Sequence, residues 1–251
     1  MFDLDLQSIP GLVEKFHFHI LKVNVLKNET KIFLERCPEN FQNLNYEIAI
    51  QNRWFGNKSD ARIKHLFQVF NSRYLAYPKP ISLLKKNIHK MNQLDWNWII
   101  YIHLLVTDPV FRWFSCDYLF SLSLGEEFSR DELARNMEEV LKDHIRTNTR
   151  ITLSAKLITA GKFLGILKGG SYFKYSPLDF SHFGLYYVLY FLQTLSFDIN
   201  LFPKTNLFRG FYPKKDRFTI DLEELSGNKY IHLHWYGDEP SIQLSFEKEV
   251  L

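Results

Sequence analysis

Residues 129–175 restrict the possible folds of the chain most strongly, because two helical patterns there are followed by a hairpin with glycines at its tip. Ser129 and Glu132 have the spacing of a capping box, and apolar residues recur at helical intervals from there to about Asp143. A break at residues 147–149 precedes a second helical pattern, and two β-prone arms then flank Gly169-Gly170. Helix, turn, helix and short hairpin is the outline of a winged helix, which we expect here.

The first half of the chain is expected to be mainly helical. Apolar residues recur at helical spacing after Ser59, and the prolines within residues 77–80 end that helix. Two further helices are expected over 81–91 and 95–106, and Asp108-Pro109 begins the next one, which extends to Gly125. Earlier in the chain, residues 16–20 and 23–25 alternate as in a strand, although a helix is also compatible with them.

The last part of the chain predicts a small α+β cap. Residues 230–236 and 241–246 alternate on either side of a Gly-Asp-Glu-Pro turn, and Asp221–Leu225 predicts one or two helical turns. We therefore expect a mainly α fold with small β-hairpins. Its expected parts are a mainly helical domain over 1–106, a winged-helix-like domain over 107–200 and the cap over 201–251.

The cysteine content and the hydropathy of the chain indicate in which cellular compartment the protein works. The two cysteines, Cys37 and Cys116, are too few for a disulfide scaffold or for a zinc site built mainly from thiolates. The opening MFDLDLQSIPGL has two acids and no basic segment, so we expect no signal peptide. Since the longest apolar stretches fall short of the about 20 residues that cross a bilayer, we expect a cytoplasmic protein with no membrane partner.

Charge is distributed unevenly, although the net charge is only +3. Residues 53–90 carry nine Lys or Arg against one acid, and residues 142–174 carry seven against one. Between them, residues 108–139 carry eight acids and three Arg. Two basic blocks in a nearly neutral chain predict a face that binds a polyanion, with ordinary solvated helix surface as the alternative.

A winged helix would bring the second basic block to its nucleic-acid face. The second helix, over about 149–163, would present its basic side chains to solvent, and the hairpin would add one lysine at its tip and one on its arm. No cluster suited to reading base edges is present, so we expect weak sequence preference on double-stranded DNA. A basic winged helix that only docks proteins is the alternative. The residues expected to contact phosphates are Arg53, Lys58, Arg62, Lys64, Arg146, Thr149, Arg150, Lys156, Lys162, Lys168 and Lys174.

Nothing in the sequence favours catalysis. The chain lacks the phosphate-loop, dinucleotide, nucleophile-elbow, HExxH and CxxC motifs, and Cys116 with His103 or His144 has no orienting third group. The pairs His17/His19 and His232/His234 each offer two metal ligands on one strand face, but ordinary strand positions explain them better. We expect no enzymatic activity, no catalytic residue, no cofactor and no metal.

Three segments resemble the BrxA family, small accessory components of bacterial BREX phage-defence systems. They are NRWFGNKSDARIKHLFQVFNSRY (52–74), DPVFRWFSCDYLFSLSLGEEFSRDELARNMEEVL (108–141) and TNTRITLSAKLITAGKFLGILKGG (147–170). The resemblance covers roughly residues 31–195 and rests on spacing and pattern. It implies a non-enzymatic helical protein with a NusB-like domain and a winged-helix-like part. It also implies binding of double-stranded DNA beside other proteins of the defence system.

Two alternatives to DNA binding remain open. One is a docking module of the defence complex that uses an aromatic surface around Trp96, Trp98, Tyr101 and Trp113, although these residues also have the helical spacing of a core. The other is binding of RNA by the NusB-like half. Neither the oligomeric state nor a preferred DNA sequence follows from the sequence.

Overall fold

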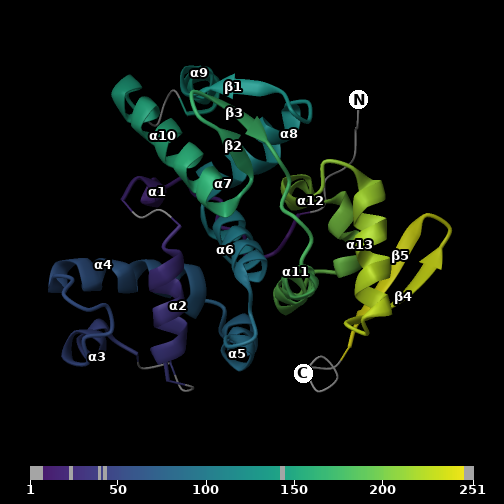
Figure 1. The fold of residues 1–251 in the computed structure, drawn as a ribbon, viewed down its shortest axis with the longest axis horizontal. Coiled ribbons are helices and arrows are strands. Elements are labelled where there is room, and N and C mark those ends of the chain that lie inside the picture. The colour runs from purple at the N-terminus through teal and green to yellow at the C-terminus, as the bar shows by residue number, and fades with distance from the viewer. Residues whose placement is uncertain (1–7, 23–24, 39–40, 42–43, 142–144, 246–251) are drawn as a thin grey trace.

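The computed structural model describes residues 8–22, 25–38, 41, 44–141 and 145–245. The chain is mainly helical with a few small antiparallel strand pairs, as the sequence predicts. Figure 1 shows two helices in the middle, α6 (Gln93–Thr107) and α11 (His182–Thr194), with three groups of elements around them. The groups are α2–α5, α7–α10 with strands β1–β3, and α12–α13 with strands β4–β5.

Before the first group lies the segment whose alternation is compatible with either a strand or a helix. The structure has a short helix there, α1 at His19–Lys22, and residues 23–24 lie outside the described part. A strand needs a neighbour for its backbone groups, whereas this segment lies against the end of α6. There the Val13 N–H donates to the Val106 carbonyl at 3.0 Å, and His17 Nε2 lies 2.8 Å from the Thr107 carbonyl oxygen.

The first group consists of four helices. They are α2 (Lys27–Arg36), α3 (Tyr46–Gln51), α4 (Asp60–Phe70) and α5 (Pro78–Asn87). Ser59 caps α4 by accepting a hydrogen bond from the Arg62 N–H at 3.4 Å. The chain continues from α4 through a π-helical turn, η1 (Asn71–Leu75), before the prolines start α5.

Helix α6 is buried on almost all sides, and α11 packs along it. A capping box fixes its start, since the Asn92 side chain accepts from the Asp95 N–H and Asp95 accepts from the Asn92 N–H. Gly184 lets α11 come close, because a Cβ there would lie 2.5 Å from Cγ of Trp98. The Trp98 indole N–H donates to the Asp179 carbonyl at 2.8 Å.

The second group begins at Asp108, which caps α7 (Pro109–Trp113) by accepting from the Phe111 N–H at 2.9 Å. A π-helical turn, η2 (Phe114–Tyr118), and the short α8 (Leu119–Ser121) follow. The expected helix therefore ends earlier than Gly125. The prediction did not include the π-helical turn, which interrupts the regular helical ladder.

A three-stranded antiparallel sheet and two helices complete the second group. The chain order is β1 (Glu127–Ser129), α9 (Arg130–Leu141), α10 (Thr147–Leu164), β2 (Leu167–Gly169) and β3 (Tyr172–Tyr175). In the sheet the order is β1-β3-β2, so the first strand pairs with the last. The capping box is confirmed: Ser129 Oγ accepts from the Glu132 N–H at 3.2 Å, and the Glu132 carboxylate accepts from the Ser129 N–H.

Ser129 is thus both the last residue of β1 and the cap of α9, with no loop between them. The strand β1 was not predicted, because three residues are too short to show alternation. The hairpin turn requires glycine at position 169, where φ is +109° and a Cβ would lie 2.2 Å from the Tyr172 carbonyl oxygen.

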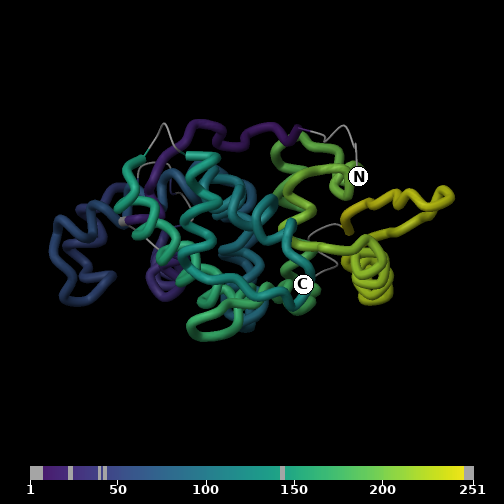
Figure 2. Tube along the Cα trace, turned by 90° about the horizontal axis from the view of Figure 1, so that it is seen from above, coloured from purple at the N-terminus to yellow at the C-terminus, as the bar shows by residue number. Residues whose placement is uncertain are grey.

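The third group contains a 3-10 helix η3 (Ile199–Lys204), α12 (Asn206–Phe211), α13 (Lys215–Gly227), β4 (Ile231–Tyr236) and β5 (Glu239–Leu244). The C-terminal hairpin is confirmed, although its turn is only Gly237-Asp238 and Phe246 lies outside the described residues. Helix α13 is much longer than the expected turn or two. Figure 2 shows the hairpin projecting from the body of the molecule.

A continuous hydrophobic cluster runs from Ile9 to Ile242 through all three groups. The division at residues 106 and 200 therefore stays a prediction. None of the described helices has the length and hydropathy of a bilayer-spanning segment.

Candidate nucleic-acid interface

Helix α10 has one buried and one accessible side. Its buried side, including Leu153, Leu157 and Leu164, packs on the core. Its 18 residues contain no Asp or Glu. The accessible side runs along the whole helix and consists of Asn148, Ile151, Thr152, Ala155, Lys156, Thr159, Lys162 and Phe163. In the described part of the chain, neither Lys156 nor Lys162 forms an ion pair.

The sheet next to α10 presents a second basic surface. Strand β3 alternates, so Phe173 and Tyr175 point into the core while Tyr172 and Lys174 point outward. Lys168 on β2 pairs directly with Lys174 and so lies on the same outer face. Lys174 Nζ lies 3.0 Å from the Glu127 carboxylate on β1, which neutralises part of this positive charge.

Lys162 contacts a residue on the core-facing side of the sheet. Its ammonium group lies 5.8 Å from the centre of the Phe173 ring, within the range of a cation–π contact. The accessible side of α10 carries Lys156 and Lys162, and the outer side of the sheet carries Lys168; these three lysines have no ion-pair partner among the described residues. We call these two surfaces together the α10–sheet face.

The expectation that Arg150 lies on the solvent side of its helix is wrong. Arg150 is buried, and its Nη2 lies 2.8 Å from the Glu138 carboxylate on α9 and 3.0 Å from the Thr147 hydroxyl. Position 150 lies one turn before Leu153, so it shares the buried side of the helix. Its role is to hold α9 against α10 at the edge of an open cavity of about 490 Å³.

The two remaining residues of this block lie at the start of α10. Arg146 is exposed at the N-cap position, and its side chain does not cap the helix. Thr149 is half-buried. Arg146 is therefore accessible to an anion next to the free N–H groups of the first turn, which favour negative charge.

The first basic block lies on another part of the molecule, around α3 and α4, below α10 in the view of Figure 1. Lys58 pairs with Glu29 at 3.4 Å, and Lys64 lies over the Tyr46 ring with 5.3 Å from Nζ to the ring centre. Arg62 is half-buried, and Arg53 is exposed in a left-handed turn with φ of +48°. Several of these cations thus already have partners within the chain.

Most of the residues considered for an aromatic docking surface are buried. Trp96, Trp98 and Tyr101 are buried in the core, and Trp113 is only partly accessible. The reason is that α6 is buried on every side from Asp95 to Thr107 by the elements around it. The exposed aromatic residues that the sequence analysis missed include Phe163 on α10 and Tyr172 on β3, which are 50% and 60% exposed.

The histidines and cysteines considered for chemistry are not assembled into a site. Burial lowers the pKa of His103 to about 3, and its ring is held between the Arg73 carbonyl and the Tyr187 hydroxyl at 2.6 and 2.7 Å. Burial raises the pKa of the Cys116 thiol, which favours the unreactive protonated form. His144 lies outside the described residues.

The two HxH pairs have different surroundings. The rings of His17 and His19 stack with 4.1 Å between their centres, whereas His232 and His234 lie on the exposed outer side of the C-terminal hairpin. Within the described ranges, no three His, Cys, Asp or Glu side chains gather as metal ligands would.

Comparison of the chain with protein-family models, with curated proteins and with solved structures finds no match.

Proposed function

We propose that this protein binds double-stranded DNA through the α10–sheet face, as a non-enzymatic accessory protein of a BREX-type phage-defence system. The observation that carries the proposal is an 18-residue helix without a carboxylate, whose accessible side has two unpaired lysines. At 1.5 Å per residue this helix is about 27 Å long, and a major groove about 12 Å wide admits a helix of this kind.

The order of the elements supports a winged-helix-like domain. Two helices separate β1 from the β2–β3 hairpin, and β1 pairs with β3 in the sheet. In this arrangement α10 is the recognition helix and the hairpin is the wing, so Lys168 and Lys174 flank the groove. The helical N-terminal half is proposed to be NusB-like on the strength of the BrxA resemblance, which is also the support for the defence role.

The chemistry of the face favours contacts to phosphates over contacts to bases. Lysine ammonium groups and helix N–H groups recognise phosphate oxygens of any sequence. Among the accessible residues of α10, Asn148 alone carries a side-chain amide, which is the type that reads adenine. Weak sequence preference and strong dependence on salt follow.

Fluorescence anisotropy of a labelled duplex of about 30 base pairs, at about 50 and 200 mM salt, tests the proposal. The logarithm of the affinity should fall by about 0.9 per logarithm of salt for each neutralised phosphate. The double variant Lys156→Glu with Lys162→Glu should weaken binding to all sequences and reduce this slope by about two contacts. A matched control, Lys79→Glu with Lys229→Glu, changes the net charge equally at exposed sites elsewhere.

If the two double variants bound DNA equally well, the interface would have to lie on a part of the molecule other than α10. Absence of binding by the native protein at 50 mM salt would reject the DNA proposal altogether.

A second candidate is protein docking by the same face, because Ile151 and Phe163 are 40% and 50% exposed beside the lysines. In that case a partner from the defence system would stay bound at high salt, and Phe163→Ala would release it. Exposed apolar side chains of this size are typical anchors of protein interfaces.

A further inference from the structure

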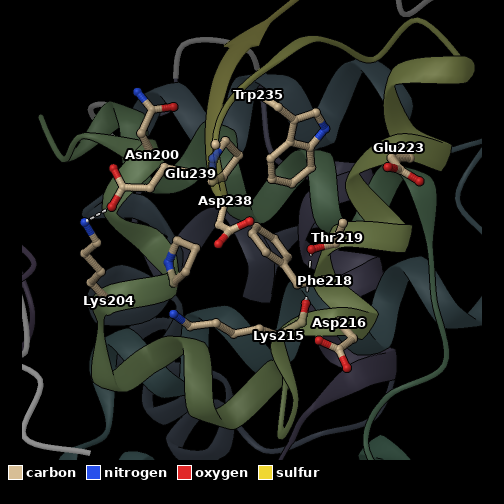
Figure 3. Close-up of a pocket in the computed structure, with 13 residues that line it drawn as sticks. Asn200, Lys204, Lys215, Asp216, Phe218, Thr219, Glu223, Trp235, Asp238 and Glu239 are labelled. Atoms are coloured by element: carbon tan, nitrogen blue, oxygen red, sulfur yellow. Dashed lines mark hydrogen bonds and ion pairs between the residues drawn. The ribbon is translucent and has the colours of Figure 1, made fainter.

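The C-terminal hairpin forms a pocket with α13 that has no part in the α10–sheet face. Near its base, β4 packs on α13, with Ile231 paired to Leu244 and Leu233 paired to Ile242. Toward the tip, at the pair Trp235–Pro240, the hairpin and the first half of α13 separate. An open cavity of about 580 Å³ fills the space between them (Figure 3).

Apolar rings form part of the cavity wall. Phe218 of α13 is buried at its base, whereas Trp235 is 38% exposed and lines the opening. Pro203 of η3 and Pro240 of β5 complete the apolar surface. Trp235 is the most accessible of the five tryptophans, and the other four contribute to the core or pack against it.

The charged groups around this wall are mostly acidic. Lys204 Nζ lies 2.7 Å from the Glu239 carboxylate, so these two charges neutralise each other. The remaining charged side chains of the lining are Asp216, Glu223, Asp238 and Lys215. Figure 3 shows Asp238 on the hairpin side and Lys215 and Asp216 on the α13 side. In the described structure, none of the three carboxylates has an ion-pair partner.

We propose that this pocket binds a cationic side chain, arginine or lysine, presented by a peptide segment of a partner protein. An accessible indole face attracts a cation and packs against its aliphatic stem, and the surplus of carboxylates supplies the opposite charge. Arginine fits best, because its planar guanidinium stacks on an indole while its N–H groups reach carboxylates. The cavity volume lies within the range of pockets that enclose a ligand of this size.

This ligand is opposite in charge to the DNA of the proposed function. The pocket repels phosphates, whereas the α10–sheet face attracts them, so the two sites are separate. The proposal consequently does not rest on DNA binding.

The test is a titration of the full-length, ¹⁵N-labelled protein with a blocked Gly-Arg-Arg-Gly peptide, followed by NMR. The indole N–H signal of Trp235, assigned by its loss in Trp235→Phe, should shift, and the shift should diminish at about 500 mM salt. A Gly-Glu-Glu-Gly peptide of the same length should leave this signal in place.

The double variant Asp216→Asn with Asp238→Asn should lower the affinity for the arginine peptide at least tenfold. Its matched control, Asp60→Asn with Asp179→Asn, removes the same charge at exposed positions outside the pocket and should bind as the native protein does. The variant Lys156→Glu with Lys162→Glu should also bind the peptide normally, which separates this test from that of DNA binding. No shift at millimolar arginine peptide, an equal shift with the glutamate peptide, or unchanged affinity in the pocket variant would each overturn the proposal.

Discussion

Helices α6 and α10 are of similar length, 15 and 18 residues, but the protein uses them differently. In α6 the polar groups are enclosed with partners inside the core, as the capping Asp95 and the ring of His103 are. In α10 the polar groups of one whole side remain accessible, and two lysines lack a counter-charge among the described residues. Helix α6, which contains two tryptophans, therefore forms part of the core. Helix α10 has a polar side that a ligand can contact.

The largest effect that tests this contrast is expected from Trp98→Ala in α6. Trp98 is 1% exposed, packs directly on Gly184 and donates a hydrogen bond to Asp179. Removing such a side chain leaves a cavity, so the free energy of unfolding should fall by about 3–5 kcal/mol. Urea unfolding followed by circular dichroism measures this loss. A decrease of less than about 1 kcal/mol would mean that α6 is not the centre of the core.

A smaller loss of stability is expected from Glu138→Gln, which removes the counter-charge of Arg150. Because the buried guanidinium then has only neutral acceptors, the amide oxygen at position 138 and the Thr147 hydroxyl, the free energy of unfolding should fall by about 1–3 kcal/mol. Glu139→Gln is the matched control, since that neighbouring carboxylate is exposed and should change stability by less than about 0.5 kcal/mol.

The salt dependence of DNA binding should not lose a contact in Arg150→Gln. Arg150 faces α9 and not the accessible side of α10, so its charge takes no part in phosphate binding. A reduced salt slope in this variant, with normal folding, would show that Arg150 contacts a phosphate.

The pH dependence of stability should reveal the enclosed His103. Its pKa in the folded protein is about 3, far below the value of about 6.5 in an unfolded chain, so only the unfolded chain takes up the proton between these values. Stability from this group is complete above about pH 6.5 and is lost as the pH falls, by about 1.4 kcal/mol per pH unit at most. Urea unfolding at pH 7, 6 and 5 should show this slope in the native protein and a smaller slope in His103→Gln.

The smallest effect on stability is expected from Phe163→Ala on the accessible side of α10. The ring is half exposed, so its removal should change the free energy of unfolding by no more than about 0.5 kcal/mol. The same denaturation measurement as for Trp98→Ala gives a direct comparison of the two helices. A loss above about 1.5 kcal/mol would show that Phe163 is part of the core.

Local signals in the sequence were sufficient for much of the fold. The spacing of Ser129 and Glu132, the cap at Ser59 and the glycines of both hairpins each act within a few residues, so they can be recognised without the rest of the chain. Contacts between distant segments could not be predicted in this way. The strand β1 is defined by its pairing with β3, and Arg150 is buried because Glu138 of another helix lies opposite it.

The same distinction between local signals and distant contacts applies to the candidate sites. Lys156, Lys162 and Lys168 were found because charge is visible in the sequence, and the structure leaves them accessible. The pocket beside Trp235 was missed, since it arises from three segments that approach one another only in the folded chain. Asp238 lies in the turn of the C-terminal hairpin, and it lines the pocket together with Trp235 and residues of α13.

The junction at Ser129 has a mechanical consequence. Because one residue both ends β1 and caps α9, no hinge lies between the sheet and this helix, and two residues alone separate α10 from β2. Since only Gly165 and Ile166 lie between the recognition helix and the wing of the proposed interface, the angle between these two elements has little freedom to change. A duplex whose groove does not match that angle must itself bend or change width, so the stiffness of the DNA, rather than its bases, would decide which sites are occupied.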